Sequence, residues 1–295
     1  MPRYPIYIPS KGRAERLLTA RFLMADKIPF HVVVEAQERD AYARVVGADR
    51  VLVLPHVGQG LFQSRNWIKA HATAAGTVRH WQLDDNIKRI RRLWGLKRIP
   101  CAAGPALAAV EDFVDRYENV AVAGLAYEEF VVPRAKLPPF SVNTHVYSTT
   151  LVLNAVPFGW RMLYNDDTDL CLQALAQGWC TVQVNAFMAN KMKTMTVAGG
   201  NVDIYQGDGR LRMARDLERL WPGLVTVRRR YGRPQHVIDW KRFQKRSLIL
   251  RAGMVDKPAD EYGMTLRALD PARVAASPEL TEIMDQYAAH TKGDA

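Results

Sequence analysis

Hydrophobic positions in the first 125 residues follow two alternating spacings. Short runs rich in β-branched and aromatic residues predict strands, which are Tyr4–Pro9, Phe30–Glu35, Arg50–Pro55, Val78–Leu83 and Asn119–Gly124. Apolar residues at helical spacing lie between these runs and predict the helices Arg13–Ala25, Gln37–Val46, Leu61–Ala75 and Pro105–Tyr117. Gly47 and Gly76 stand where the second and third helices should end. The alternation predicts an α/β fold with a mostly parallel sheet flanked by helices.

The pattern changes after residue 125 to a mixed region. It predicts a strand over Val146–Leu153, a helix over Asp167–Gln177 and a strand over Thr181–Asn185. Basic segments that read as helices follow at Arg210–Leu220 and Asp239–Leu250. We therefore predict two regions, a nucleotide-binding and catalytic domain over residues 1–204 and a basic C-terminal extension over residues 205–295. Residues 256–295 indicate no specific structure or role.

Charge adds a candidate partner to this picture. The 295 residues carry a net charge of +11, and the segment Arg210–Arg251 holds 13 Lys or Arg against Asp216, Glu218 and Asp239. A cationic surplus attracts polyanions, so we predict nucleic acid as a partner and this segment as its binding region. The oligomeric state is not predicted.

Targeting signals and disulfides add nothing further. No run of 18 apolar residues and no N-terminal signal region occur, which predicts a soluble cytoplasmic protein without a membrane partner. The three cysteines have no metal-ligand spacing and are expected to be reduced thiols.

Polar residues directly after the predicted strands are candidate functional groups, because α/β sheets bind ligands beyond the carboxyl ends of their strands. Asp84, Asp85 and Asn86 follow the strand Val78–Leu83 and offer the oxygen ligands that Mg²⁺ or Mn²⁺ on a diphosphate requires. A solvated turn is the structural alternative, because Asp and Asn are common turn residues.

Several residues could bind the donor nucleotide. Ser10, Lys11 and Arg13 follow the first strand and offer donors to a phosphate or a base edge. Glu35 could accept hydrogen bonds from a uracil or a ribose. The spacing matches neither a Walker loop nor a dinucleotide fingerprint, and a plain basic turn explains the first group equally well.

Arg65 and Asn66 lie on the helix that precedes the Asp84–Asn86 strand. Arg65 could pair with a diphosphate, and Asn66 could orient the sugar or the first aspartate. In the alternative, Arg65 only bridges to Asp84 or Asp85.

A second acidic cluster, Asn165–Asp169, opens the helix predicted at Asp167. Carboxylates in a first helical turn stabilise the positive end of the helix dipole, so capping is one explanation. Three carboxylates exceed that need, and one can act as a general base on an acceptor hydroxyl. We assign that role to Asp167, supported by Asp166.

Together these motifs resemble the GT-A glycosyltransferases. More narrowly, the segments Tyr7–Arg13, Trp81–Asn86, Tyr164–Leu170 and Thr194–Asn201 are similar to the TET-associated glycosyltransferases, over about Tyr4 to Trp240. That family is encoded largely by bacteriophages, beside oxygenases that make 5-hydroxymethylcytosine. The resemblance implies metal-assisted transfer from a nucleotide-sugar, expected to be a UDP-sugar, to 5-hydroxymethylcytosine in DNA inside a phage-infected cell. We expect the transfer to be inverting, because an in-line base such as Asp167 favours single displacement.

The resemblance also implies site residues. It places the metal, Mn²⁺ or Mg²⁺, at Asp84, Asp85 and Asn86, although Asn86 is a weaker ligand than the usual carboxylate. Where many GT-A enzymes have a late histidine, this chain has Asn190 and Lys191, and Lys191 could neutralise the leaving diphosphate. The donor-binding residues expected are Ser10, Lys11, Arg13, Glu35, Arg65, Asn66, Asp84, Lys191, Thr194, Gly199 and Gly200.

Cations interleaved with aromatic residues fit phosphate contacts and stacking on a displaced base. The residues expected to contact DNA are Arg228, Arg229, Arg230, Arg233, His236, Trp240, Lys241, Arg242 and Lys245. A solvated basic helix has the same composition, and His145 and His236 can equally be structural.

Three other functions stay open at this point. The chain could be a GT-A enzyme for a protein or glycan acceptor, or a non-catalytic nucleic-acid-binding protein with a degenerate sugar-nucleotide pocket. A sugar-phosphate nucleotidyltransferase is the third, but its glycine-rich first loop does not match the segment 9–17.

Overall fold

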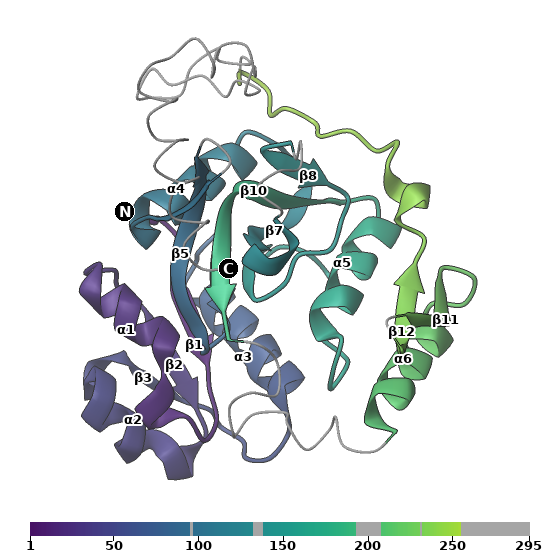
Figure 1. Ribbon diagram of the computed structural model, residues 1–295. Coiled ribbons are helices and arrows are strands. Elements are labelled where there is room, and N and C mark those ends of the chain that lie inside the picture. Colours follow the sequence, from purple (N-terminus) through teal and green to yellow (C-terminus); the bar gives the residue numbers. More distant parts are fainter. Residues whose placement is uncertain (95–96, 132–137, 193–207, 231, 255–295) are drawn as a thin grey trace, which may run out of the picture.

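The computed structural model describes residues 1–94, 97–131, 138–192, 208–230 and 232–254. These residues build a ten-stranded sheet of order β3-β2-β1-β4-β9-β7-β10-β5-β6, with β8 paired to β10 (Figure 1). Within it, β9, β5 and β8 run against the direction that the other strands share. The predicted fold class, a mostly parallel sheet flanked by helices, is confirmed.

The elements predicted in the first 125 residues are all present, with differences at their ends. The strands of the sheet are β1 (Ile6–Pro9), β2 (His31–Val34), β3 (Val51–Val53), β4 (Arg79–Leu83), β5 (Ile87–Trp94), β6 (Lys97–Pro100), β7 (Val120–Tyr127), β8 (Phe140–Val142), β9 (Thr149–Leu153) and β10 (Cys180–Lys191). The helices are α1 (Leu18–Ala25), α2 (Arg39–Val46), α3 (Leu61–Ala74), α4 (Ala103–Val114), α5 (Asp166–Ala176) and α6 (Gly209–Leu220).

Alternation of side chains along the strands divides the core between the two faces of the sheet. Ile6 and Ile8 of β1 pack in the cluster that α1, α2 and α4 complete. Tyr7, which lies between them, packs instead with Ile68 and Ala72 of α3. Helices therefore cover both faces and leave the strand ends at the edges of the sheet open to ligands.

The region after β4 departs from prediction, because β5, β6 and β8 are strands that the apolar pattern did not indicate. β5 carries charged residues at half of its positions, with Ile87 and Ile90 as its buried anchors. A strand with so few apolar residues has a weak hydrophobic periodicity and is missed for that reason.

The basic segment folds onto the sheet domain. α6 is followed by an antiparallel hairpin of β11 (Val225–Arg230) and β12 (Arg233–Ile238). Leu217, Leu224 and Val225 pack with Leu172 of α5 in one apolar cluster. The described part of the predicted C-terminal extension thus shares a core with the catalytic region, and the division at residue 204 stays a prediction.

The helix predicted over Asp239–Leu250 is wrong. Only a single 3-10 turn, Trp240–Phe243, forms there. Asn143 donates its amide to the carbonyls of Phe243 and Arg246, at 2.9 and 2.8 Å, and this holds the following chain in an irregular path. Tertiary hydrogen bonds override the helical composition of this segment. In the described part of the chain, no helix has the length and apolar character needed to span a membrane.

Candidate active site

The candidate site lies where strands of common direction end at one edge of the sheet. Ser10 follows β1, Glu35 follows β2, Asp84 follows β4 and Lys191 ends β10. Because these strands run the same way, their carboxyl ends bring residues far apart in sequence into one place. The structure thus brings the candidate residues that follow these strands to one edge of the sheet, and their role in chemistry stays a prediction.

Asp84 is held between two cations. Arg65 Nη2 lies 3.0 Å from its Oδ1, and Lys191 Nζ lies 2.6 Å from its Oδ2. Burial alone would raise the pKa of Asp84, but the charges of Lys191 and Arg65 lower it below its usual value. For Lys191, burial is likewise outweighed by Asp84, which raises the lysine pKa. Both side chains are therefore ionised.

Asp85 has a separate set of partners from the first loop. Arg13 Nη1 lies 2.7 Å from Oδ1, and the Ser10 hydroxyl donates to Oδ2 at 2.7 Å. Burial raises the pKa of Asp85 despite these contacts. The adjacent Asn86 has a buried side-chain oxygen without a hydrogen-bond partner among the described residues.

Arg65 joins the two acidic clusters. Its Nε lies 2.9 Å from Asp166 Oδ2, while its other nitrogens bond Asp84 and the side-chain oxygen of Gln82. Its side chain is only 6% exposed. A buried guanidinium between two carboxylates compensates charges that would otherwise be costly to bury. The two aspartate groups, eighty positions apart in sequence, therefore face one site.

Asp167 faces His145 instead of the arginine. His145 Nε2 is 3.4 Å from its Oδ1, and the backbone N–H of Thr168 donates to the same oxygen at 2.7 Å. Burial acts to raise the pKa of Asp167, but His145 outweighs it and the pKa is lowered. The pKa of Asp166 is raised, chiefly by burial. The pair thus separates into an ionised carboxylate and one that holds a proton more readily.

The third carboxylate of the cluster has a structural role. Asp169 is fully buried and accepts from Arg161 at 2.8 and 2.9 Å and from the indole of Trp221 at 2.7 Å. It anchors α6 to α5. Asn165, at the N-cap of α5, makes no side-chain cap hydrogen bond, and within the first turn the Asp167 carboxylate accepts from the backbone N–H of Thr168.

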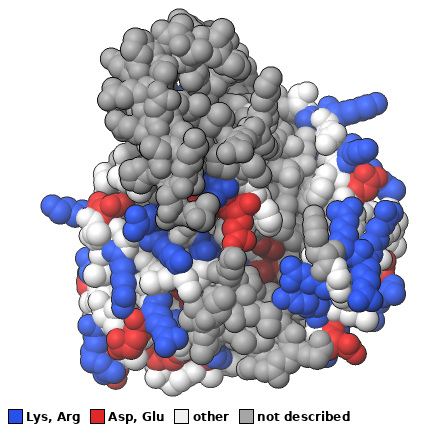
Figure 2. All heavy atoms as spheres, viewed as in Figure 1, with Lys and Arg blue, Asp and Glu red and all other residues white. Residues whose placement is uncertain are grey.

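Basic surfaces flank this acidic site on two sides. The hairpin ribbon consists of Arg228, Arg229, Arg230 and Arg233 on β11 and β12, all exposed. The β5–β6 ribbon consists of Lys88, Arg89, Arg91, Arg92 and Arg98, of which the first two are exposed. Figure 2 shows acidic side chains in the centre of the face, with Lys and Arg gathered on either side.

A model of the family described as TET-Associated Glycosyltransferase matches residues 4–200, which include every carboxylate of this site. The chain belongs to this family. It is therefore a glycosyltransferase, and the non-catalytic alternative is excluded. Membership also supports a nucleotide-sugar as the donor.

Other comparisons add little. No curated protein matches the sequence. A solved structure of a candidate nucleotide-diphospho-sugar transferase from Desulfovibrio desulfuricans G20 is 12% identical, with a TM-score of 0.39, and the match covers 75% of this chain and 99% of that one. A likeness this distant has no bearing on function.

The described residues of this TET-associated glycosyltransferase do not fit the predicted metal site. Each oxygen of Asp84 already contacts a cationic nitrogen, and Asp85 is shared between Arg13 and Ser10. A divalent ion needs such oxygens as ligands and would have to displace the arginine and the lysine first. Within the described ranges, no group of three or more His, Cys, Asp or Glu side chains could hold a metal.

The remaining predicted donor residues have different positions. Glu35 is buried, accepts from Lys11 Nζ and from the backbone N–H of Gly58, and closes the β2 end of the site. Asn66 uses both ends of its amide on the backbone of Trp160, at 2.6 and 2.9 Å. That contact anchors the loop before α5 and gives Asn66 a structural role. Thr194, Gly199 and Gly200 lie outside the described residues.

The predicted DNA residues continue from the hairpin toward the site. His236 is half-buried on β12, and Lys241, Arg242 and Lys245 are exposed. The Trp240 ring stacks on the His145 ring, with 6.2 Å between the ring centroids and 17° between the ring planes. His145 contacts Asp167, so Trp240 connects the basic segment to the second acidic cluster.

Sequence reasoning missed several residues at this edge. Ser148 holds Lys191 through its hydroxyl at 3.0 Å and has a left-handed backbone, with φ of 67°. Tyr127 and Tyr147 form an aromatic pair, with centroids 6.3 Å apart, next to His145. No sequence signal identifies Ser148, whereas the run of cations in β5 was visible in composition.

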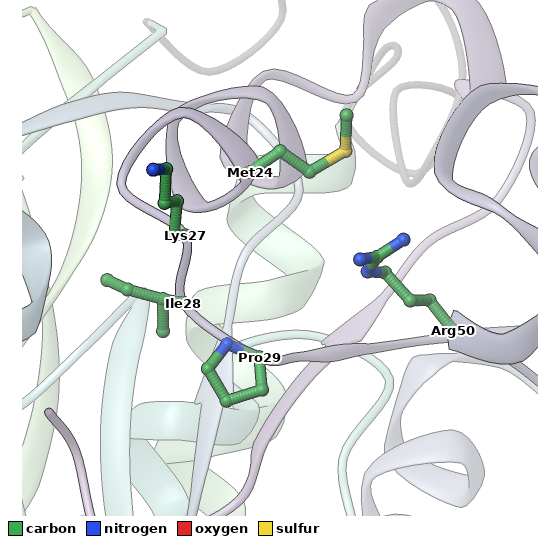
Figure 3. Close-up of a pocket in the computed structure, with 5 residues that line it drawn as sticks. All are labelled: Met24, Lys27, Ile28, Pro29 and Arg50. Carbon is green, nitrogen blue, oxygen red and sulfur yellow. The ribbon is translucent and has the colours of Figure 1, made fainter.

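Two cavities among the described residues were considered as ligand sites. One, of about 370 Å³, is lined by Lys191, Asn190, Tyr127, Glu128 and residues of the β5–β6 ribbon, and adjoins the site. The other, of about 400 Å³, lies between Met24, Lys27, Ile28, Pro29 and Arg50 (Figure 3). It lies at the start of β2, at the other end of the strand from Glu35, and no carboxylate lines it. We therefore assign it no catalytic role.

Proposed function

We propose that this enzyme transfers a sugar from a UDP-sugar to the hydroxymethyl group of 5-hydroxymethylcytosine in DNA. The observation that carries the proposal is the acidic site between two basic ribbons. DNA phosphates are attracted to the ribbons, and the carboxylates between them face the base to be modified. Family membership supports the same acceptor, because its name links these transferases to oxygenases that produce hydroxymethylated cytosine.

The donor nucleotide occupies the β1 and β2 ends of the site in this proposal. Glu35 accepts from the uracil or the ribose, and Lys11 and Ser10 lie beside it. The diphosphate lies near Arg13, Arg65 and Lys191, where cationic donors surround the strand ends. The anomeric carbon is thereby directed toward α5.

The catalytic step is a single displacement that inverts the anomeric carbon. The acceptor hydroxyl oxygen bonds to that carbon while the bond from the carbon to the diphosphate oxygen breaks. Asp167 takes the hydroxyl proton, which its ionised state permits, and Asp166 supports it through Arg65. The departing diphosphate carries away the bonding electrons and is stabilised by the nearby cations.

The acceptor base must leave the duplex to reach Asp167. The cavity beside Lys191, about 370 Å³ in volume, provides a place for it, and Tyr127 offers an aromatic face there. Trp240 stands on the other side of Asp167, over His145. We propose that these aromatic rings hold the displaced base.

Mass spectrometry of DNA after reaction tests this function. Duplexes that contain 5-hydroxymethylcytosine, and matched duplexes with cytosine, are incubated with the enzyme, a panel of UDP-sugars and Mg²⁺ or Mn²⁺. We expect a mass increase of one sugar residue only on the hydroxymethylated strand. Transfer to a protein or glycan fraction, with none to either duplex, would instead establish the rival acceptor class.

A further inference from the structure

We propose that Lys191 and Arg65, held in place by Asp84, form a cationic clamp for the donor diphosphate that replaces a divalent metal ion. The inference rests on the proposed function for the identity of the donor. It assigns Asp84 to holding the clamp instead of to binding a metal. The support comes from the contacts around Lys191 and from the charge balance of the site.

The backbone around Lys191 is shaped to direct its side chain at Asp84. β10 pairs with β5, and the pairing has a bulge here, because Asn190 lies opposite Arg89 and Lys191 opposite Ile87, which leaves Lys88 of β5 as the extra residue. Such bulges re-aim side chains next to functional sites. Ser148, which accepts from Lys191, has a left-handed backbone that non-glycine residues rarely adopt. Two local distortions therefore converge on one lysine.

Contacts of Ser148 tie this arrangement to the β4 end. Its carbonyl accepts the backbone N–H of Asp84 at 2.8 Å, while its hydroxyl contacts Lys191 Nζ. The same residue thus positions both partners of the Lys191–Asp84 pair. A built pair of this kind differs from a chance contact between two mobile side chains.

The charge balance leaves Asp84 unsuited to a dication. Its two oxygens neutralise Arg65 and Lys191, and Arg65 is also fixed by Gln82 and Asp166. A metal on Asp84 would take this carboxylate away from both cations, at a cost in free energy that is largest for the buried Arg65. The diphosphate has the opposite effect, because its negative charge adds to that of Asp84 between the same cations.

Lys191 also has free capacity for such a ligand. An ammonium group has three donors, and Asp84 and Ser148 account for two of them. The side chain is 18% exposed and lines the cavity of about 370 Å³ beside the site. A phosphate oxygen on the strand-end side of Lys191 can take the third donor without disturbing the pair, and the cavity stays available for the displaced base.

Calorimetry of UDP binding tests the clamp independently of any acceptor. Enzyme treated with EDTA and enzyme supplied with Mn²⁺ are titrated with UDP, for the native chain and for Lys191→Ala, Lys191→Arg and, as a control cation on α2, Arg44→Ala. We expect the native Kd to be the same with either treatment, within about twofold. Lys191→Ala should weaken binding by about 10- to 100-fold, the value of a charged hydrogen bond.

The two substitutions at Lys191 separate the clamp from a structural effect. Lys191→Arg keeps the cation and should recover most of the affinity. In Lys191→Ala the freed Asp84 oxygen becomes available, so Mn²⁺ should restore part of the binding in this variant alone. The clamp is overturned if native enzyme binds UDP only with Mn²⁺, or if Lys191→Ala binds UDP as tightly as the native chain does.

Transfer assays separate failure of the clamp from failure of the proposed function. Sugar transfer to hydroxymethylated DNA is measured with EDTA and with Mn²⁺. Activity under both conditions supports the clamp, and activity with Mn²⁺ alone overturns it while leaving the acceptor assignment intact. Absence of transfer under both conditions rejects the acceptor, and the UDP titration still decides the clamp.

Discussion

Arginine is used in opposite ways in the acidic site and in the hairpin ribbon. Arg65 is buried among Asp84, Asp166 and Gln82, and these contacts fix the position of its charge. Arg228 and its neighbours stand exposed on a two-stranded hairpin. Buried pairs fix geometry and resist salt, whereas exposed charges attract partners over a distance and are screened. Loss of an arginine should therefore have different effects in the two regions.

The largest loss should follow from replacing the base. Asp167→Asn keeps the size of the side chain but removes its proton affinity, so turnover should fall by about 10²- to 10⁴-fold while UDP binding stays unchanged. Sugar transfer to hydroxymethylated DNA, with calorimetry of UDP, measures both effects. Asp239→Asn, at an exposed position, is the control. Unaltered turnover would remove Asp167 from the mechanism.

Loss of Arg65 should be the largest effect on folding. Arg65→Ala leaves Asp84 and Asp166 buried without their shared cation, which should lower the free energy of unfolding by about 3–5 kcal/mol. Urea denaturation followed by fluorescence measures it. Arg228→Ala in the hairpin ribbon should change stability by less than about 0.5 kcal/mol. Equal losses at the two positions would contradict the contrast between buried and exposed arginines.

The next largest effect should come from acid, which should destabilise the region behind the site through His80. The arginines of the hairpin ribbon do not titrate in this pH range. His80 is fully buried, and its ring contacts the side-chain oxygen of Asn154 at 2.5 Å and the side-chain nitrogen of Gln82 at 2.9 Å. Burial lowers its pKa to about 4. A second ring proton would meet the Gln82 amide, itself a donor.

The sign of the pH effect follows from this lowered pKa. The unfolded histidine binds a proton near pH 6.5 and the folded one only near 4, so stability is complete above about 6.5 and falls as the pH drops toward 4, by about 3 kcal/mol. Denaturation curves at several pH values should show this loss, and His80→Gln should lack that part of it. If the free energy of unfolding fell equally with pH in the native chain and in His80→Gln, His80 would not be the group responsible.

The accuracy of prediction from sequence also differs between these two regions. Apolar periodicity located β1 to β4 and α1 to α5, and the rule that ligands bind after strands picked out Asp84, Asp85, Arg65 and Asp167. All four lie at one edge of the sheet. The sequence could not predict which carboxylate pairs with which cation, because the pairing depends on packing across the sheet.

Residues without a periodic signal were the ones missed. The left-handed backbone of Ser148 and the bulge of β5 opposite Lys191 are details of backbone geometry that no spacing encodes. β5 was missed because its charges hide a strand period, and Asp239–Leu250 was taken for a helix because the side chains that hold it, Asn119 and Asn143, are distant in sequence. Local composition therefore predicted the buried region well and the surface region poorly.

The ribbons should produce the smallest change, and one that depends on salt. Replacing Arg228, Arg229 and Arg230 by Ser removes up to three phosphate contacts, so the slope of log affinity for DNA against log salt should become shallower by up to about 2.7, at about 0.9 for each contact. Fluorescence anisotropy at several salt concentrations measures the slope. Transfer at saturating DNA should be unchanged, because the carboxylates and the clamp remain.

A matched pair of substitutions on the other ribbon decides whether DNA spans the acidic site. Lys88 and Arg89 are exposed on β5, and Arg39 and Arg44 are exposed on α2, so replacing either pair by Ser removes the same charge. If DNA contacts both ribbons, only the β5 pair should reduce the slope, by up to about 1.8. Equal reductions for the two pairs would mean that net charge alone attracts DNA. The salt slope for a specifically placed duplex depends on the phosphates that contact the protein, whereas long-range attraction depends on the total charge.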